Sequence, residues 1–412
     1  MNLYILNALL YVALFIFIYK GHLCGKWYVL PLVGLFAFSS ICSILYYGTP
    51  LYYSLTERGT NQVSLEGLLY ILINFIIFLI PLLKLNIAAQ NLKHYDSIIK
   101  FAVFLGVVAI IPTFEILRLL LNTNVSDMAD QYELNQTESV NVMTQLSIVA
   151  RYCNSILTWF AYFTPVLLFY VISQKAKKYI ILLAFLAFIE PVLGTLLRGG
   201  RGQLYMLIML LVYNYFLFNN FFSDTVRKSI RKIGIFFSFV SVVLLISMTV
   251  ARASSDTDLA MSQIYRYLGE GFVNFAETGY YSDKCSWGLS IFNGTGYTWM
   301  KDLGEYFQGR NWQYLTQYMG IRMYVYYTVF GDYFLDFGFI GGLVFNSFLA
   351  FVIYTLIVNK KAKLYIFLIV NLYARIGING IYCYFYMNYM EFLLFSFLLV
   401  ILLYLYERKK HY

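Results

Sequence analysis

Long apolar runs recur along the whole chain and are separated by short polar segments. A run of roughly 20 apolar residues is long enough to cross the hydrocarbon core of a membrane as an α-helix. The pattern predicts an all-α fold, a polytopic transmembrane helical bundle of about eleven spans. The predicted spans are residues 3–19, 28–47, 66–83, 98–121, 151–172, 179–197, 203–221, 233–250, 333–358, 364–380 and 389–406.

The composition supports this fold, since 60% of the 412 residues are hydrophobic, 12% are charged and the mean hydropathy is +0.67. Residues 3–19 have no basic leader and no small-residue cleavage site, so we expect an uncleaved span rather than a signal peptide. The net charge of +9 lies largely in short loops, and we expect no nucleic-acid partner. The 5 cysteines and 3 histidines lack metal-ligand spacing, so we expect no metal and no cofactor.

Basic clusters occur in every second loop between the predicted spans. Because positive loops mark the cytoplasmic side, the N-terminus is predicted outside and the C-terminus inside. The clusters assigned to the cytoplasm are Lys20/Lys26, Lys84/Lys93/Lys100, Lys175/Lys177/Lys178, Arg227/Lys228/Arg231/Lys232, Lys360/Lys361/Lys363 and Arg408/Lys409/Lys410. The outer side holds most arginines and nearly all acids, and arginine there favours binding of an anion.

Two outer segments are long. Residues 122–150 are polar and acidic, and residues 251–332 are rich in Tyr, Gly, Asn and mixed charge. We therefore divide the chain into three parts. Residues 1–250 contain eight spans and the outer loops 122–150 and 198–202, residues 251–332 form the large outer loop, and residues 333–412 contain three spans. Such long loops are usually functional.

The most distinctive local motif is the basic turn Leu197-Arg198-Gly199-Gly200-Arg201-Gly202-Gln203. Its glycines allow close approach of backbone N–H groups, two guanidinium groups can bind phosphate oxygens, and the next helix begins there. We expect a pyrophosphate site. The alternative is a hairpin turn whose arginines hold anionic lipid headgroups. Glu190 lies about two turns earlier, where it can orient Arg198.

Within the large outer loop, Arg266, Glu270, Asn274 and Glu277 have the spacing of one helical face. We expect an amphipathic helix on the membrane surface, weakened by two glycines. The functional interpretation makes Glu270 or Glu277 a general base and Arg266 part of an anion clamp. The alternative is a solvated polar face.

The remainder of this loop alternates aromatic residues with amides and acids between Trp287 and Tyr318. Aromatic faces and planar hydrogen-bonding groups suit sugar rings. The alternative is an aromatic belt at the membrane interface. Arg310 and Arg322 are further candidates for binding an anion.

Four features together resemble the bacterial O-antigen polymerases, which are Wzy-type oligosaccharide repeat-unit polymerases. They are the number of spans, the turn at 197–203, the long loop with its 265–275 stretch, and the sequence from Asp332 to Gly341 that leads into the next span. The resemblance covers residues 180–358 by local pattern and the rest by hydropathy.

The resemblance implies a membrane glycosyltransferase with a GT-C-like fold and a large periplasmic loop, located in the bacterial inner (plasma) membrane. It would transfer a growing glycan from undecaprenyl pyrophosphate to an incoming lipid-linked repeat unit, building O-antigen or capsule-type polysaccharide. Its implied partners are lipid-linked glycans, membrane lipid, a chain-length regulator and a flippase. The candidate pyrophosphate-binding residues are Arg198, Arg201, Arg266, Arg310 and Arg322, and the candidate catalytic acids are Glu270, Glu277 and Asp336.

Three other functions stay open. A lipid-linked oligosaccharide flippase needs a polar path through both membrane halves, which the nearly uncharged inner halves of the spans disfavour and Asn74, Pro112 and Glu115 favour. The similar O-antigen ligases carry a functional histidine in the large outer loop, whereas the histidines here are the predicted cytoplasmic residues His22, His94 and His411. A non-catalytic assembly scaffold would not require the arginines.

Overall fold

The computed structural model describes residues 2–21, 26–54, 62–86, 92–122, 142–198, 201–252, 257–288, 312–323, 325–358, 360, 362–382 and 390–409. Every regular element in these ranges is an α-helix or a short 3-10 helix. Among them, seven helices are long and apolar enough to cross a membrane, or eight if one bent pair counts as a single span. The chain is therefore an all-helical, multi-pass membrane protein.

Each predicted span contains a helix. The N-terminal ones are α1 (Asn2–Lys20), α2 (Leu30–Tyr46) after the turn η1 (Trp27–Val29), α4 (Leu65–Lys84), α5 (Asp96–Leu121) and the pair α7 (Ile148–Phe160) and α8 (Thr164–Ser173). They are followed by α9 (Lys178–Leu197), α10 (Arg201–Phe218), α11 (Asp224–Arg252), α15 (Thr328–Ile357), α16 (Leu364–Asn379) and α17 (Met390–Lys409). Outside the predicted spans lie α3 (Pro50–Ser54), α12 (Thr257–Glu277), η4 (Gly279–Tyr281) and α14 (Trp312–Met319).

Several apolar runs are not simple spans. The run at 151–172 is broken, because α7 and α8 meet at a bend of 76°. The helix α16 has 16 residues, which is short for a hydrocarbon core that needs roughly 20. About eleven spans and a GT-C-like arrangement stay predictions.

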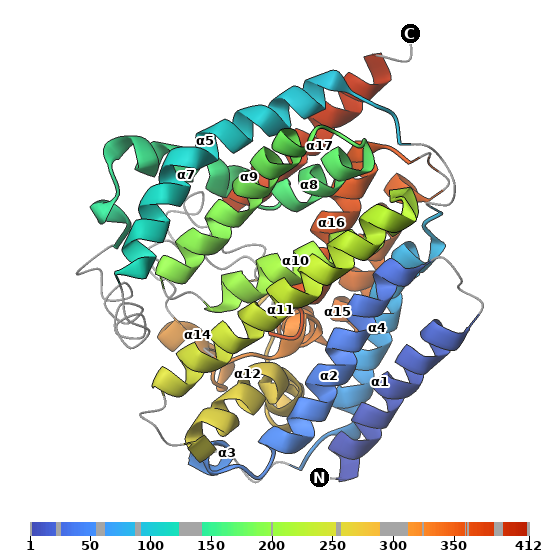
Figure 1. The fold of residues 1–412 in the computed structure, drawn as a ribbon. Coiled ribbons are helices and arrows are strands. Elements are labelled where there is room, and N and C mark those ends of the chain that lie inside the picture. The colour runs from blue at the N-terminus through green and yellow to red at the C-terminus, as the bar shows by residue number, and fades with distance from the viewer. Residues whose placement is uncertain are drawn as a thin grey trace. The chain divides into compact units, whose positions relative to one another are not determined.

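The described chain forms two compact units. The first comprises Met1–Asn86, Met261–Lys360 and Leu372–Leu398, and the second comprises Ile87–Ala260, Lys361–Asn371 and Leu399–Tyr412. In the first unit α1, α2 and α4 run side by side, and α15 packs on α4 (Figure 1). Aromatic rings fill this core: Phe36 stacks on Phe75 at 4.1 Å between centroids, and Phe78 stacks on Tyr373 at 4.4 Å.

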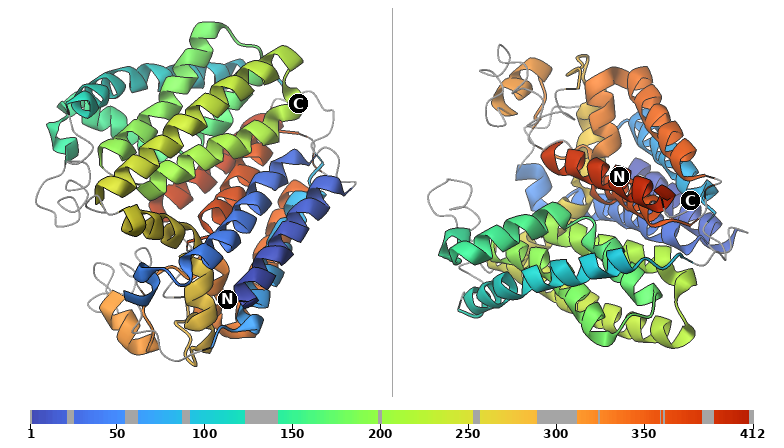
Figure 2. Two further views of the ribbon diagram at one scale, coloured as in Figure 1. Left: turned by 60° about the horizontal axis from the view of Figure 1, so that its bottom comes forward. Right: turned by 90° about the horizontal axis from the view of Figure 1, so that it is seen from above.

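The helix α15 folds back on itself at Gly338, whose φ of 72° lies in the left-handed region that favours glycine. After the break, Gly342 comes so close to the first half that a Cβ there would lie 2.8 Å from the Tyr333 carbonyl oxygen. The rings of Tyr333 and Phe345 lie 5.0 Å apart. The two orange halves of α15 accordingly meet at an angle (Figure 2, right).

The first half of α15 starts deep among the neighbouring helices. The ring of Phe330 lies 5.9 Å from Phe36 and 6.2 Å from Phe75, near the middle of α2 and α4. At this depth the backbone N–H groups of Thr328 and Val329 donate to the carbonyls of Tyr382 and Gly380, just beyond the end of α16. Residues 328–357 thus form a candidate span where 333–358 was predicted, but its helix is sharply broken at Gly338.

The second unit is built on the pair α5 and α9, with α7, α8 and α10 packed around α9 (Figure 2). The two central helices touch through Gly106, where a Cβ would lie 2.6 Å from the Leu183 carbonyl oxygen. The start of α7 is fixed by Ser147, whose side chain accepts from the Ala150 N–H. The Glu115 carboxylate in α5 accepts from the Ser147 N–H at 2.7 Å and from its hydroxyl at 2.6 Å.

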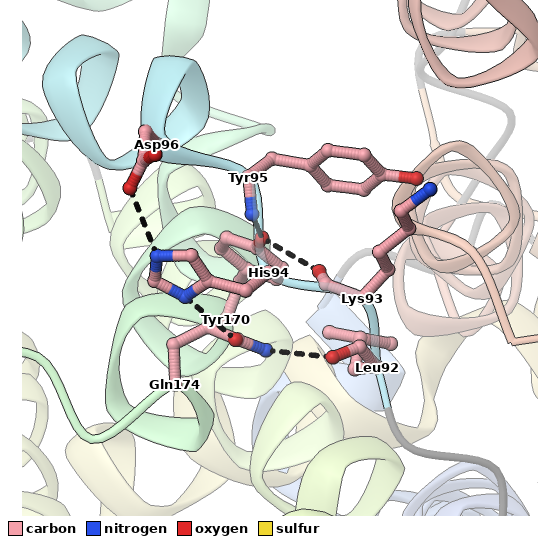
Figure 3. A network of polar contacts seen from close by, with 7 residues as sticks. All are labelled: Leu92, Lys93, His94, Tyr95, Asp96, Tyr170 and Gln174. Carbon is pink, nitrogen blue, oxygen red and sulfur yellow. Dashed lines mark hydrogen bonds and ion pairs between the residues drawn. The ribbon is translucent and has the colours of Figure 1, made fainter. Parts of the chain in front are cut away.

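A polar network fastens the loop before α5 to the end of α8. It consists of Leu92, Lys93, His94, Tyr95, Asp96, Tyr170 and Gln174 (Figure 3). The Tyr170 hydroxyl donates to the Lys93 carbonyl and accepts from the Tyr95 N–H, each at 2.9 Å. The ring nitrogens of His94 lie 3.0 Å from Gln174 and from Asp96. This arrangement gives His94 a structural role.

Gly106→Ala is expected to destabilise the protein, because a methyl group would separate the α5 and α9 backbones. Overpacking of this kind costs about 1–3 kcal/mol. Gly234→Ala on α11 is the matched control, since nothing lies within 4 Å of its Cβ position. Thermal unfolding in detergent should give a lower melting temperature for the first variant only; equal melting temperatures would contradict this packing.

Candidate functional site

The polar residues predicted on one helical face lie in α12, and most of them are buried. Arg266, Glu270, Asn274 and Glu277 share a face, as their spacing requires. The last three are 2%, 5% and 6% exposed. The interpretation as a solvated face on a surface helix is wrong for residues 269–277, because other elements cover this part of α12 on all sides.

Two glycines allow this burial. A Cβ on Gly269 would lie 2.7 Å from the Cys42 carbonyl oxygen in α2. A Cβ on Gly271 would lie 2.6 Å from the Ile381 carbonyl oxygen and 2.9 Å from the Thr328 methyl carbon. From the sequence alone, these glycines are expected to weaken the helix. In the structure their missing side chains let three backbones approach one another.

Arg266 and Glu270 form an ion pair at the partly buried end of this face. The Arg266 Nε donates to Glu270 Oε2 at 2.9 Å, and the Asn274 amide donates to Glu270 Oε1 at 3.0 Å. The same amide donates to the Tyr326 carbonyl at 3.0 Å. Burial acts to lower the pKa of Arg266, but the Glu270 carboxylate outweighs it and the pKa is raised. The guanidinium therefore stays charged.

Glu277 links three helices. The Tyr4 hydroxyl in α1 donates to Glu277 Oε1 at 2.8 Å, and the Tyr52 hydroxyl in α3 lies 3.0 Å and 3.2 Å from its two oxygens. Hydrogen bonds to a carboxylate are stronger than those between neutral groups. Glu277 thus has a defined orientation beside the first turn of α1.

Asp336 lies just before the break in α15 and is fully buried. The Ser286 hydroxyl donates to its carboxylate. The backbone N–H groups of Ser286 and Trp287 donate to the carbonyls of Leu335 and Asp336 at 2.8 Å and 2.9 Å. The neighbouring Cys285 thiol has a raised pKa, caused first by burial and second by the Asp336 charge.

Two further arginines of the first unit are predicted to bind an anion, and the structure describes one of them, Arg322. Arg322 is half-buried, and its carbonyl accepts from the Tyr327 hydroxyl at 2.7 Å. Arg310 and the predicted sugar-binding aromatic residues of 289–311 lie outside the described residues. The first unit therefore brings Arg266 and Glu270 into direct contact, whereas Glu277 and Asp336 have hydrogen-bond partners of their own.

In the second unit, Arg198 lies at the end of α9 and is half-buried. Its Nε donates to the Gly194 carbonyl at 3.1 Å. The fully buried Glu190 accepts from the Asn154 amide of α7 at 2.7 Å. Arg201 is the first residue of α10, but its side chain lies outside the described part. The tight connection between α9 and α10 is thus confirmed.

The structure adds residues that the sequence analysis missed. Asn154 was detectable as an amide within an apolar run, a position that usually requires a partner. Tyr4 and Tyr52 had no such signal, because the chain contains 40 tyrosines. In the described ranges no three His, Cys, Asp or Glu side chains are grouped so that they could hold a metal ion.

Comparison with known proteins gives no relative from which a role could be transferred. No family model, no curated protein and no solved structure matches the chain. The function must therefore be argued from the residues and their geometry.

The effect of the Asp336 charge on the Cys285 pKa can be measured in a variant whose other cysteines are replaced by serine. Asp336→Asn should lower the Cys285 pKa, raise the thiolate fraction at a given pH, and speed maleimide labelling by about two- to tenfold. The rate profile should shift to lower pH. Asp283→Asn, at an exposed acid two residues away, serves as the control. Unchanged labelling in Asp336→Asn would mean that no carboxylate charge acts on this thiol.

Proposed function

We propose that this protein is a membrane glycosyltransferase, a polysaccharide polymerase. It joins undecaprenyl-pyrophosphate-linked oligosaccharide repeat units into O-antigen or capsule-type polysaccharide at the outer face of the bacterial inner membrane. The N-terminus is periplasmic, the C-terminus is cytoplasmic, and residues 251–332 form the periplasmic loop of a GT-C-like fold. The all-helical architecture and the buried ionisable residues support the proposal.

The observation that carries the proposal is the position of Arg198. Its guanidinium is held at the end of α9 by the Gly194 carbonyl, three residues before α10 begins at Arg201. A fixed guanidinium group can bind two phosphate oxygens at once, and the start of a helix attracts negative charge. This combination suits a diphosphate better than a single carboxylate.

The reaction requires three tasks. The bond between the anomeric carbon and the donor phosphate oxygen breaks, a bond from that carbon to an acceptor hydroxyl oxygen forms, and the hydroxyl proton passes to a base. The diphosphate leaves with the bonding electron pair, so its growing charge must be stabilised. Arg198 and Arg201 are assigned to one diphosphate, and Arg266, Arg310 and Arg322 are assigned to the second lipid-linked substrate.

The base is assigned to one of the buried acids. Glu270 is the weakest candidate, because its carboxylate is already engaged in an ion pair with Arg266 and accepts a hydrogen bond from Asn274. It is better suited to position Arg266. Glu277 and Asp336 accept hydrogen bonds from neutral hydroxyl groups and are the stronger candidates. Residues of the predicted aromatic loop would position the acceptor sugar.

Arg198→Ala and Arg201→Ala should abolish polymer formation by purified protein supplied with lipid-linked repeat units. Arg201→Lys should also be impaired, because lysine keeps the charge but cannot bind two oxygens in a fixed plane. Arg151→Ala on α7 is the matched control, since that arginine is exposed. Polymer of normal length from either alanine variant, with wild-type expression, would remove that arginine from the site.

The broken helices favour a second candidate function, a lipid-linked oligosaccharide flippase. Transporters often build their substrate sites from discontinuous helices, and both the α7–α8 bend and the Gly338 break are of this kind. Proteoliposomes with repeat units in one leaflet discriminate between the two. Polymerisation without movement of the lipid supports the enzyme, whereas movement without polymerisation supports the transporter.

A further inference from the structure

Glu190 and Asn154 form a buried polar contact in the second unit that the reaction above does not use. Glu190 in α9 is 0% exposed, and its Oε1 accepts from the Asn154 amide at 2.7 Å. No described residue forms a hydrogen bond with its Oε2. A buried carboxylate with so few partners remains ionised only beside a positive charge.

Arg198 supplies that charge. Glu190, Gly194 and Arg198 are spaced by four residues and lie in one row along α9. The Arg198 Nη2 lies 3.9 Å from the position of a Cβ on Gly194, and the Asn154 Nδ2 lies 3.3 Å from the same position. Because Gly194 has no side chain, the guanidinium and the amide converge above the backbone, with Glu190 one turn away.

The helices packed against α9 carry other titratable groups, but the described arginines among them are exposed. Cys153 on α7 lies close enough to Glu190 to sense its charge. On α5, Glu115 is bound by Ser147 and Arg118 is exposed, as is Arg151 on α7. From α8 and α10 the described titratable side chains are tyrosines, among them Tyr170 and Tyr205. Of the described side chains, Arg198 is therefore the cation placed to balance Glu190.

We propose that Glu190 and Arg198 form a proton-linked anion site. When a phosphate-type dianion or diphosphate draws the Arg198 guanidinium to itself, Glu190 loses its counter-charge and takes up one proton from solvent. The inference rests on the proposed function, because the lipid diphosphate is the anion concerned. The proton offsets one of the negative charges that the anion brings, so the cluster gains less net charge than it would without the proton, and departure of the diphosphate releases the proton.

The test uses the purified full chain and inorganic sulfate, which does not titrate between pH 5 and 8. Calorimetry in buffers of different ionisation enthalpy should show uptake of about one proton, with affinity rising by up to about tenfold per pH unit as pH falls. Glu190→Gln should bind sulfate more tightly than wild type at pH 8, without pH dependence. If Glu190 were merely structural, the same variant would bind more weakly.

Two further variants control the experiment. Glu190→Asp keeps the charge and should keep the proton uptake, and so should Glu115→Gln on the neighbouring helix. Weaker binding with wild-type pH dependence in Glu190→Gln would overturn the inference. If that variant does not fold, the wild-type proton count decides, since binding without proton uptake also overturns it.

Assays of polymerisation keep the two proposals separate. Proton-linked sulfate binding by a protein that makes no polymer would refute the polymerase and leave the anion site in place. Polymer formation with sulfate binding that is independent of pH would refute the proton linkage alone.

Discussion

Hydrogen bonds between polar side chains and neighbouring helices hold this structure together, because an unpaired polar group among apolar helices costs free energy. Asn346 donates to the carbonyl of Asn74 at 2.8 Å and so fixes the register of α15 on α4. In the other unit Asn371 donates to the Tyr162 carbonyl at 2.8 Å. The Asn154 bond to Glu190 does the same for α7 and α9. Apolar packing alone would allow neighbouring helices to slide.

Glycine supplies the close approach that these contacts need. Gly106, Gly269 and Gly271 each lie where a side chain would meet the backbone or side chain of another helix. Gly194 has a different effect, since its missing side chain leaves room for Asn154 and Arg198. The glycines are thus placed at the polar contacts as well as at the tight ones. Glycines therefore serve both the close packing of the helices and the arrangement of the candidate site residues.

The sequence predicts the helices well because hydropathy is a local property, and every predicted span contains a helix. The face shared by Arg266 and Glu270 also follows from local spacing. The burial of that face does not follow from local spacing, because the residues that cover it lie in α2 and near residue 381, far away in the chain. Glu277 shows the same limit: its partner Tyr4 is separated from it by 273 residues.

The fold-back of α15 was hidden for a related reason. Gly338 sits in an apolar run, and apolar runs give the same hydropathy whether the helix continues or reverses. Only the contacts of Tyr333 with Phe345 and of Gly342 with the Tyr333 carbonyl reveal the reversal. The candidate site residue Asp336 therefore lies just before a sharp break in α15, which hydropathy alone does not reveal.

The junction of α16 and α15 has an electrical consequence. The N–H groups that open α15 are bonded to carbonyls just past the end of α16, so the positive pole of one helix dipole meets the negative pole of the other. Opposite poles in contact cancel. The N–H groups of Thr328 and Val329 are thereby occupied, although the start of a helix usually leaves such groups open to an anion.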